Sequence, residues 1–252
     1  MGHHDDHEAE HTPEAIRRRL QQDVSQGYLK DSIYGAIDGA VTTFAVVSSA
    51  AGAGLGAGIV IILGLANLVA DGFSMAAGNF LGTRAENQAA RKARREEGEE
   101  IDRHPEGERE EIRQIFGRMG FHGDNLDKAV EIITADRNRW IDVMLIEEHG
   151  LIRDRPSACR AALATFVAFV LIGAVPLAAY LLKLASPDVL ADPFLPSCLL
   201  TGIAFFAVGA LKSRFVDQHW VLSGSETLGI GALAAGMAYG LGMLLRPLAD
   251  GI

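Results

Sequence analysis

The sequence predicts an all-α integral membrane protein, with five transmembrane helices and a helical insert between the second and the third. Two features of the 252-residue chain lead to this prediction. Apolar stretches of about 20 residues, the length that crosses a bilayer as a helix, recur along the chain. Nearly all the charged residues lie elsewhere, in an N-terminal tail and in residues 84–158, which we name the insert.

The five apolar stretches are expected to be membrane helices. Pro176 lies inside the third stretch and predicts a kink, which neighbouring helices can accommodate. The stretches are Ser32–Ala50, Gly56–Phe80, Ala161–Leu182, Pro193–Leu211 and Thr227–Leu245. The predicted boundaries are 1–27 for the polar tail, 28–83 for helices 1 and 2, 84–158 for the insert and 159–252 for helices 3 to 5.

Glycines four residues apart lie on one face of a helix and let two helices approach closely in lipid. Three such pairs are candidates for close helix contacts: Gly35/Gly39, Gly78/Gly82 and Gly236/Gly240.

The insert is expected to be a small helical domain. No proline interrupts the helical pattern from Leu81 to Glu100, so the second membrane helix should continue beyond the bilayer. His104-Pro105 should end it, because the residue before a proline avoids helical backbone angles. Three shorter helices are expected to follow: Glu106–Arg118, a second with Asp124 as its N-cap, and Arg137–Glu148.

Basic residues near the helix ends predict the orientation, because Lys and Arg are enriched on the cytoplasmic side. They precede the first helix, follow the second, precede the third and follow the fourth, whereas the loop Ala50–Gly58 has none. This places the N-terminus and the insert in the cytosol and the C-terminus outside. A bacterial inner membrane and a vacuolar membrane both fit the pattern.

The net charge of −9 excludes a nucleic-acid partner, since a polyanion binder needs a basic surplus. Cys159 and Cys198 are the only cysteines and form neither a disulfide framework nor a thiolate metal motif. The N-terminal tail carries four histidines, His3, His4, His7 and His11, which are typical of a metal-binding tract but also of an unstructured tail.

A polar ladder runs along the second membrane helix. Asn67, Asp71, Met75 and Asn79 follow one another at four-residue spacing, so they share one helix face. Asp38 lies about two turns inside the first helix. Carboxylates at membrane depth usually mark an ion path, and a nearby thioether favours a transition metal over Na⁺, Mg²⁺ or Ca²⁺. The alternatives are interhelical hydrogen bonds for the amide and carboxyl groups, and packing for the methionine.

The insert carries spaced glutamates on both sides of the Pro105 break. Glu97 and Glu100 are three residues apart, as are Glu108 and Glu111, and a fold at the proline would bring the two pairs together. Convergent carboxylates repel one another and favour a bound cation. The alternative is a solvated helix face with i,i+4 ion pairs, to which we assign Glu96, Glu99, Glu106 and Glu110. His104, His122, His149 and His219 are expected to be structural or exposed.

Two segments, DGAVTTFAVV from Asp38 and LGLANLVADGFSMAAGNFLGTRAE from Leu63 to Glu86, resemble the vacuolar iron transporter family, which includes plant nodulin-like and yeast vacuolar carriers. The resemblance covers the chain from about Tyr28 to its end. It implies five membrane helices, a homodimer, and exchange of Fe²⁺ or Mn²⁺ for protons. It also implies metal removal from the cytosol.

The resemblance extends to individual positions. Asp38 matches the family's carboxylate in the transport path, and Met75 matches its second-helix methionine. In the insert, the matched metal ligands are Glu97, Glu100, Glu108, Glu111, Glu148 and Met144. Leu145 departs from the family, which has a second methionine there. Asn79 and Glu86 lie at the expected cytosolic mouth of the path, where metal would enter.

The predicted function is therefore proton-coupled transport of Fe²⁺, with Mn²⁺ as the second candidate substrate, and with no catalytic residues and no cofactor other than the transported metal. Two alternatives belong to other classes. A ferritin-like iron oxidase would use Glu-x-x-His pairs in a helical bundle, and the only such pair is Glu8–His11 in the tail. A metal sensor would bind metal through the insert without transporting it.

Overall fold

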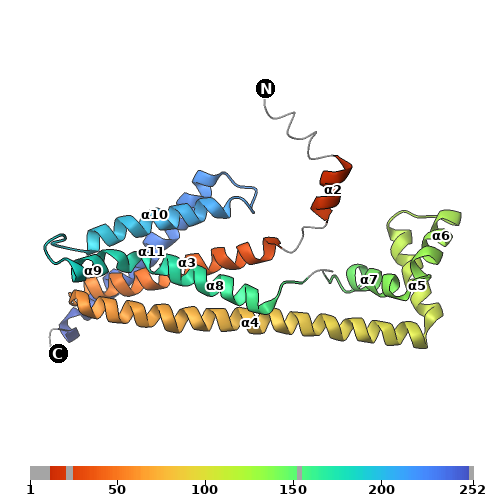
Figure 1. Cartoon of the computed structure of the whole chain (residues 1–252), viewed down its shortest axis with the longest axis horizontal. Helices are drawn as coiled ribbons and strands as arrows, with labels where there is room; N and C mark the ends of the chain where they lie inside the picture. The colour runs from red at the N-terminus through yellow and green to blue at the C-terminus, as the bar shows by residue number, and fades with distance from the viewer. Residues whose placement is uncertain (1–11, 21–24, 152–154, 250–252) are drawn as a thin grey trace, which may run out of the picture. The chain divides into compact units, whose positions relative to one another are not determined.

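The computed structural model describes residues 12–20, 25–151 and 155–249, and every regular element in these ranges is a helix (Figure 1). The N-terminal histidines lie outside the described residues. The helices are α2 (Pro13–Leu20), α3 (Ser25–Gly52), α4 (Ala57–Arg103), α5 (Pro105–Arg118), α6 (Gly123–Thr134), α7 (Arg137–Glu147), α8 (Ala158–Gly173), α9 (Val175–Ala185), α10 (Phe194–Lys212) and α11 (Trp220–Ala249).

The chain divides into two compact units. One unit, which we name the membrane unit, comprises Ser25–Leu81 and Ala158–Ile252. The other comprises Met1–Val24 and Gly82–Ser157, and the second of these segments is the insert as the structure defines it. Helix α4 contributes its first part to the membrane unit and its last part to the insert. Its 47 residues measure roughly 70 Å at 1.5 Å per residue, about twice the hydrocarbon thickness of a bilayer. The predicted continuation of this helix past Phe80 is confirmed.

Within the described ranges, four helices are long and apolar enough to cross a membrane: α3, α4, α10 and α11. Helices α8 and α9 meet at a bend of 49° and together make a fifth candidate span. Pro176 lies in the first turn of α9, where its missing N–H interrupts no hydrogen bond within that helix. The predicted kink is therefore confirmed.

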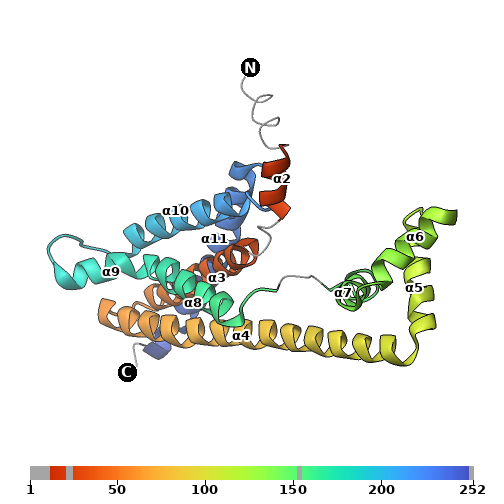
Figure 2. The same cartoon turned by 45° about the vertical axis from the view of Figure 1, so that its right-hand side comes forward.

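Helix α3 lies at the centre of the membrane unit and packs against α8, α9, α10 and α11 (Figures 1 and 2). Its contact with α8 depends on two glycines. A Cβ on Gly35 would lie 2.4 Å from the carbonyl oxygen of Thr165, and one on Gly39 would lie 2.4 Å from that of Phe169. The predicted close approach is confirmed for this pair. It is wrong for the other two pairs within one chain, because a Cβ on any of those four glycines would meet nothing within 4 Å.

The insert has an apolar core of its own, which α4, α5, α6 and α7 build. Its members are Ile101, Ile112, Ile115, Val130, Trp140, Ile141 and Met144. Glycines with positive φ end α5 and follow α7, at Gly120 and Gly150. One prediction is wrong: α6 begins at Gly123 after His122, so Asp124 lies in its first turn and is not the N-cap. An acidic residue in the first turn stabilises the positive end of the helix dipole, which explains why the pattern resembled a cap.

We predict that Gly39→Ala destabilises the membrane unit by about 1–3 kcal/mol, the usual cost of overpacking. The added methyl group would meet backbone atoms of α8, which cannot rotate away as a side chain can. The unfolding temperature of the detergent-purified protein measures the effect. Gly229→Ala is the matched control, because a Cβ there meets nothing within 4 Å. Equal unfolding temperatures for the two variants would contradict close α3–α8 packing.

Candidate metal-binding site

Carboxylates from three helices of the insert converge. Pro105 separates α4 from α5, so that Glu97 on α4 hydrogen-bonds Glu108 on α5. Glu100, Glu111 and Glu148 lie close enough for their charges to act on this pair. The convergence expected from the spacing is therefore found, and Glu148, at the C-cap of α7, joins it. That these groups bind metal stays a prediction.

Glu97 and Glu108 are buried, with only 1% and 6% of their surface exposed. Oε1 of Glu97 and Oε2 of Glu108 are enclosed and have no hydrogen-bond partner among the described residues. A buried carboxyl oxygen without a partner is costly, and a second carboxyl beside it adds repulsion when both are ionised. A cation between these oxygens removes both penalties.

Burial is the largest cause of the shifted acidity in this cluster. It raises the pKa of Glu97 to about 7 and that of Glu108 to about 8. The charges of neighbouring carboxylates add to the effect, and the hydrogen bond between the two groups favours the proton on Glu108. Burial also raises the pKa of Glu111, with further contributions from Glu148 and Glu100. Metal must displace protons from this cluster near neutral pH, because carboxylate ligands bind in their ionised form.

His149 belongs to the same cluster, although the sequence predicted a structural or exposed role for it. Its Nε2 lies 3.4 Å from Oε2 of Glu97 and 3.9 Å from Oε2 of Glu148. Among the described residues, these three side chains form a group whose ligand atoms all lie within 4.8 Å of one another. The sequence feature that could have indicated His149 as a site residue is its position directly after Glu148. Two adjacent residues are too short a pattern to distinguish from chance.

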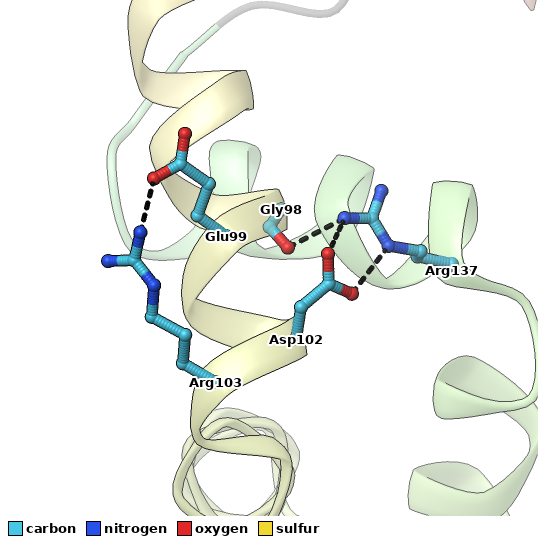
Figure 3. A network of polar contacts seen from close by, with 5 residues as sticks. All are labelled: Gly98, Glu99, Asp102, Arg103 and Arg137. Carbon is cyan, nitrogen blue, oxygen red and sulfur yellow. Dashed lines mark hydrogen bonds and ion pairs between the residues drawn. The ribbon is translucent and has the colours of Figure 1, made fainter.

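An ion-pair network fixes α7 against the end of α4 (Figure 3). The Arg137 guanidinium donates to both carboxylate oxygens of Asp102, at 3.1 and 2.7 Å, and to the carbonyl oxygen of Gly98 at 2.6 Å. Gly98 leaves room for this group, since a Cβ there would lie 2.9 Å from Nη2. Gly98 adjoins Glu97, so the network sets the position of the buried carboxyl relative to α7. The sequence did not single out Arg137, because one arginine among many has no pattern.

Met144 is completely buried and is a member of the apolar core of the insert. Leu145, at the position of the missing second methionine, packs partly buried against the same core. Both side chains thus have packing roles. Ligation by Met144 stays a prediction.

Except for Glu86, the other predicted site residues lie in the membrane unit. Asp38 is half-buried on α3, and its charge interacts with that of Asp71 on α4. Met75 is half-buried and packs against the apolar core formed around Phe44 and Phe169. The structure thus places all three on helices that surround that core, and their role in transport stays a prediction.

Two asparagines of the ladder bind other helices. Asn67 donates to the hydroxyls of Thr42 and Thr43 on α3, at 3.3 and 3.4 Å. Asn79 donates to the hydroxyl of Thr165 on α8 at 2.6 Å and also hydrogen-bonds Asp31. Interhelical bonds of this kind, the alternative weighed for Asn67, join α4 to its neighbours.

Glu86 lies on the part of α4 that belongs to the insert, and its side chain is exposed. Its carbonyl oxygen accepts a hydrogen bond from Arg155 at 2.7 Å. An exposed carboxylate in this position is free to meet cations from solution, and its predicted role in metal entry stays a prediction.

Comparison with known proteins finds similar sequences that cover most of this chain. A family model described as the VIT family matches residues 29–243. A vacuolar iron transporter of Toxoplasma gondii is 31% identical over 247 residues, which cover 96% of this chain and 78% of that protein. Vacuolar iron transporter 1 of Eucalyptus grandis is 32% identical over 216 residues, 84% of each chain. Vacuolar iron transporter 1 of Arabidopsis thaliana is 30% identical over 219 residues, 86% of each.

We predict that the metal-free insert loses stability as the pH rises from 5 to 8. The raised pKa values of Glu97 and Glu108 mean that the folded insert binds more protons than the unfolded chain over this range. The stability that this pair contributes is therefore present at pH 5 and is lost as the pH rises through the folded pKa values. The unfolding temperature should drop by on the order of 5 °C. The fluorescence of Trp140, in the core of the insert, reports the transition in a Trp220→Phe background with chelator present.

The double variant Glu97→Gln/Glu108→Gln should remove most of this pH dependence, because the amides do not titrate. The matched control is Glu96→Gln/Glu106→Gln, which changes exposed residues on the same two helices. A control that lost the pH dependence equally would contradict the assignment to the buried pair.

We also predict that Arg137→Gln weakens Zn²⁺ binding by the insert, because α7 then loses its link to the backbone beside Glu97. Arg103→Gln is the control, since Arg103 pairs only with the exposed Glu99 on its own helix in Figure 3. A competition titration with a chelating dye measures both affinities. Equal affinities would show that the network does not position the carboxylates.

Proposed function

The chain belongs to the VIT family, and we propose that it transports Fe²⁺ out of the cytosol in exchange for protons. The family is a transporter family, so the predictions of a metal transporter, of an integral membrane protein and of a non-enzyme are confirmed. The ferritin-like oxidase is thereby set aside. Iron as the metal is supported by the printed names of the relatives.

The observation that carries the proposal is the buried carboxyl pair of the insert. Glu97 and Glu108 each keep an enclosed oxygen with no hydrogen-bond partner in the described part of the chain, and three further carboxylates surround them. Such a cluster attracts divalent cations and raises their local concentration. The insert thus collects metal before transport. Its cytosolic location is supported by the basic residues at the helix ends.

In the membrane unit we assign the transport site to Asp38 and Met75, with Asp71 beside them on α4. Two interacting carboxylates on adjacent helices supply negative charge for a divalent ion. The thioether favours Fe²⁺ over Mg²⁺ or Ca²⁺. A proton and a metal ion exclude each other at a carboxylate, and this competition is the physical basis for exchange. Asn67 and Asn79 hold the helices of the path together, and Glu86 receives metal at its entrance.

We further assign a homodimer, because five helices enclose little space for an ion path and a two-fold axis lets both subunits contribute. Mn²⁺ is the second candidate substrate, since it accepts the same oxygen ligands. The C-terminus then lies outside the cytosol, in a bacterial inner membrane or a vacuolar membrane.

We predict that proteoliposomes containing the protein take up Fe²⁺ with opposing proton movement, as recorded by metal- and pH-sensitive dyes. Asp38→Asn should reduce the rate to that of protein-free liposomes, because the ionisable group is lost while the shape is kept. Asp188→Asn, in the exposed segment between α9 and α10, is the control. Glu97→Gln should instead raise the Fe²⁺ concentration needed for half-maximal rate, with Glu96→Gln as its control.

Each outcome has a distinct meaning. Fe²⁺ uptake without proton movement would reject exchange, and full activity of Asp38→Asn would reject the membrane site. Liposomes that bind Fe²⁺ yet stay impermeable to it would favour the metal sensor.

A further inference from the structure

The imidazole of His149 lies near one carboxylate oxygen of Glu97 and one of Glu148. Its Nε2 lies 3.4 Å from Oε2 of Glu97 and 3.9 Å from Oε2 of Glu148. Two ligand atoms on one metal ion lie at most about 4.2 Å apart, twice a bond length of about 2.1 Å. The three ligand atoms already lie within 4.8 Å of one another, so small side-chain rotations bring them to coordination distance.

The backbone holds His149 in this position. Its N–H donates to the carbonyl oxygen of Met144 at 3.4 Å, and the N–H of Leu151 donates to that of Leu145 at 2.8 Å. Gly150, with a φ of +63°, makes this helix-ending turn possible, because other residues rarely adopt that conformation. The buried Met144 anchors the turn in the core. His149 is therefore placed at the cluster by the fold, although 39% of its side chain is exposed.

A hydrogen bond alone explains the cluster less well. An N–H of His149 that donates to Oε2 of Glu97 satisfies one oxygen. It leaves Oε1 of Glu97 and Oε2 of Glu108 buried without partners in residues 12–20, 25–151 and 155–249. A metal ion satisfies several oxygens at once and leaves the imidazole as a neutral nitrogen ligand.

We propose that His149 is a nitrogen ligand of the metal held by Glu97 and Glu148, and that it favours Fe²⁺ and Zn²⁺ over Mn²⁺, Mg²⁺ and Ca²⁺. The chemistry follows from ligand type: imidazole suits Zn²⁺ and Fe²⁺, whereas sites made of carboxylates alone also suit Mg²⁺, Ca²⁺ and Mn²⁺. This inference rests on the proposed function, in which the insert binds the transported metal. It adds the residue that selects among metals.

The test uses the full-length protein in detergent, with His3, His4, His7 and His11 changed to Gln to remove competing imidazoles. Dissociation constants for Zn²⁺ and Mn²⁺ are measured by competition with a chelating dye. His149→Gln should weaken Zn²⁺ binding at least about tenfold, since even changes behind a ligand have that effect. Mn²⁺ binding should change much less. His122→Gln, an exposed histidine before α6, should change neither.

X-ray absorption at the zinc edge gives a readout that a purely structural role would not change. With less than one equivalent of Zn²⁺, the parent should show imidazole scattering and His149→Gln should lose it. Unfolding temperatures measured with chelator check that both proteins are equally folded. Unchanged Zn²⁺ affinity and unchanged imidazole scattering in His149→Gln would overturn the inference.

The Glu97→Gln variant distinguishes failure of the imidazole ligand from failure of the whole carboxylate metal site. If it loses Zn²⁺ binding while His149→Gln does not, the insert binds metal without the imidazole, and only the present inference fails. If Glu97→Gln binds Zn²⁺ like the parent, the carboxylate cluster is not a metal site, and the role proposed for the insert fails as well.

Discussion

The burial of two adjacent carboxyl groups, Glu97 and Glu108, is the constraint on which the insert depends. A folded domain tolerates such a pair only if the groups stay protonated or a cation joins them. The surrounding architecture keeps the pair in place: Pro105 turns the chain so that α5 faces α4, and the apolar core around Met144 holds α7 against both. Arg137 then joins α7 to the backbone beside Glu97. Burying oxygens that have no partner among the described residues is unfavourable, and a bound metal ion would remove this penalty.

In the membrane unit, the helices are held together by different interactions. In lipid, apolar surface gives little driving force for helix association, so close packing and interhelical hydrogen bonds must supply it. Gly35 and Gly39 bring the backbones of α3 and α8 together, and Asn67 and Asn79 join α4 to both helices through threonine hydroxyls. These polar bonds lie on the same ladder as Asp71 and Met75. The ion path that we propose would therefore run along the contacts that hold the helices together, so that movement of metal and packing of helices would be coupled.

Features set by local chemistry were predictable from the sequence. Apolar length predicted the spans, Pro105 and Pro176 predicted a break and a kink, and the spacing of Glu97, Glu100, Glu108 and Glu111 predicted their convergence. Features that depend on contacts between residues far apart in the sequence were not predictable. The pattern alone does not distinguish Gly35 and Gly39, which meet another helix, from Gly78 and Gly82, which meet none within one chain. Nor does it reveal Arg137 or His149, whose partners lie 35 and 52 residues away in the sequence.

The cluster combines a buried side with an open one, and this asymmetry suits a transporter better than a storage protein. Glu97 and Glu108 form the buried side, whereas Glu100, Glu111, Glu148 and His149 are exposed. A site enclosed on all sides would hold its ion for long times, because release requires the carboxylates to lose their counter-charge in a medium of low polarity. Exposed ligands exchange with water one at a time, so each step toward release has a smaller barrier. Near neutral pH a proton can take the place of the departing metal on the buried pair, since burial has raised those pKa values to about 7 and 8. In the function proposed above, metal and proton would alternate at the insert by the same competition that exchange across the membrane requires.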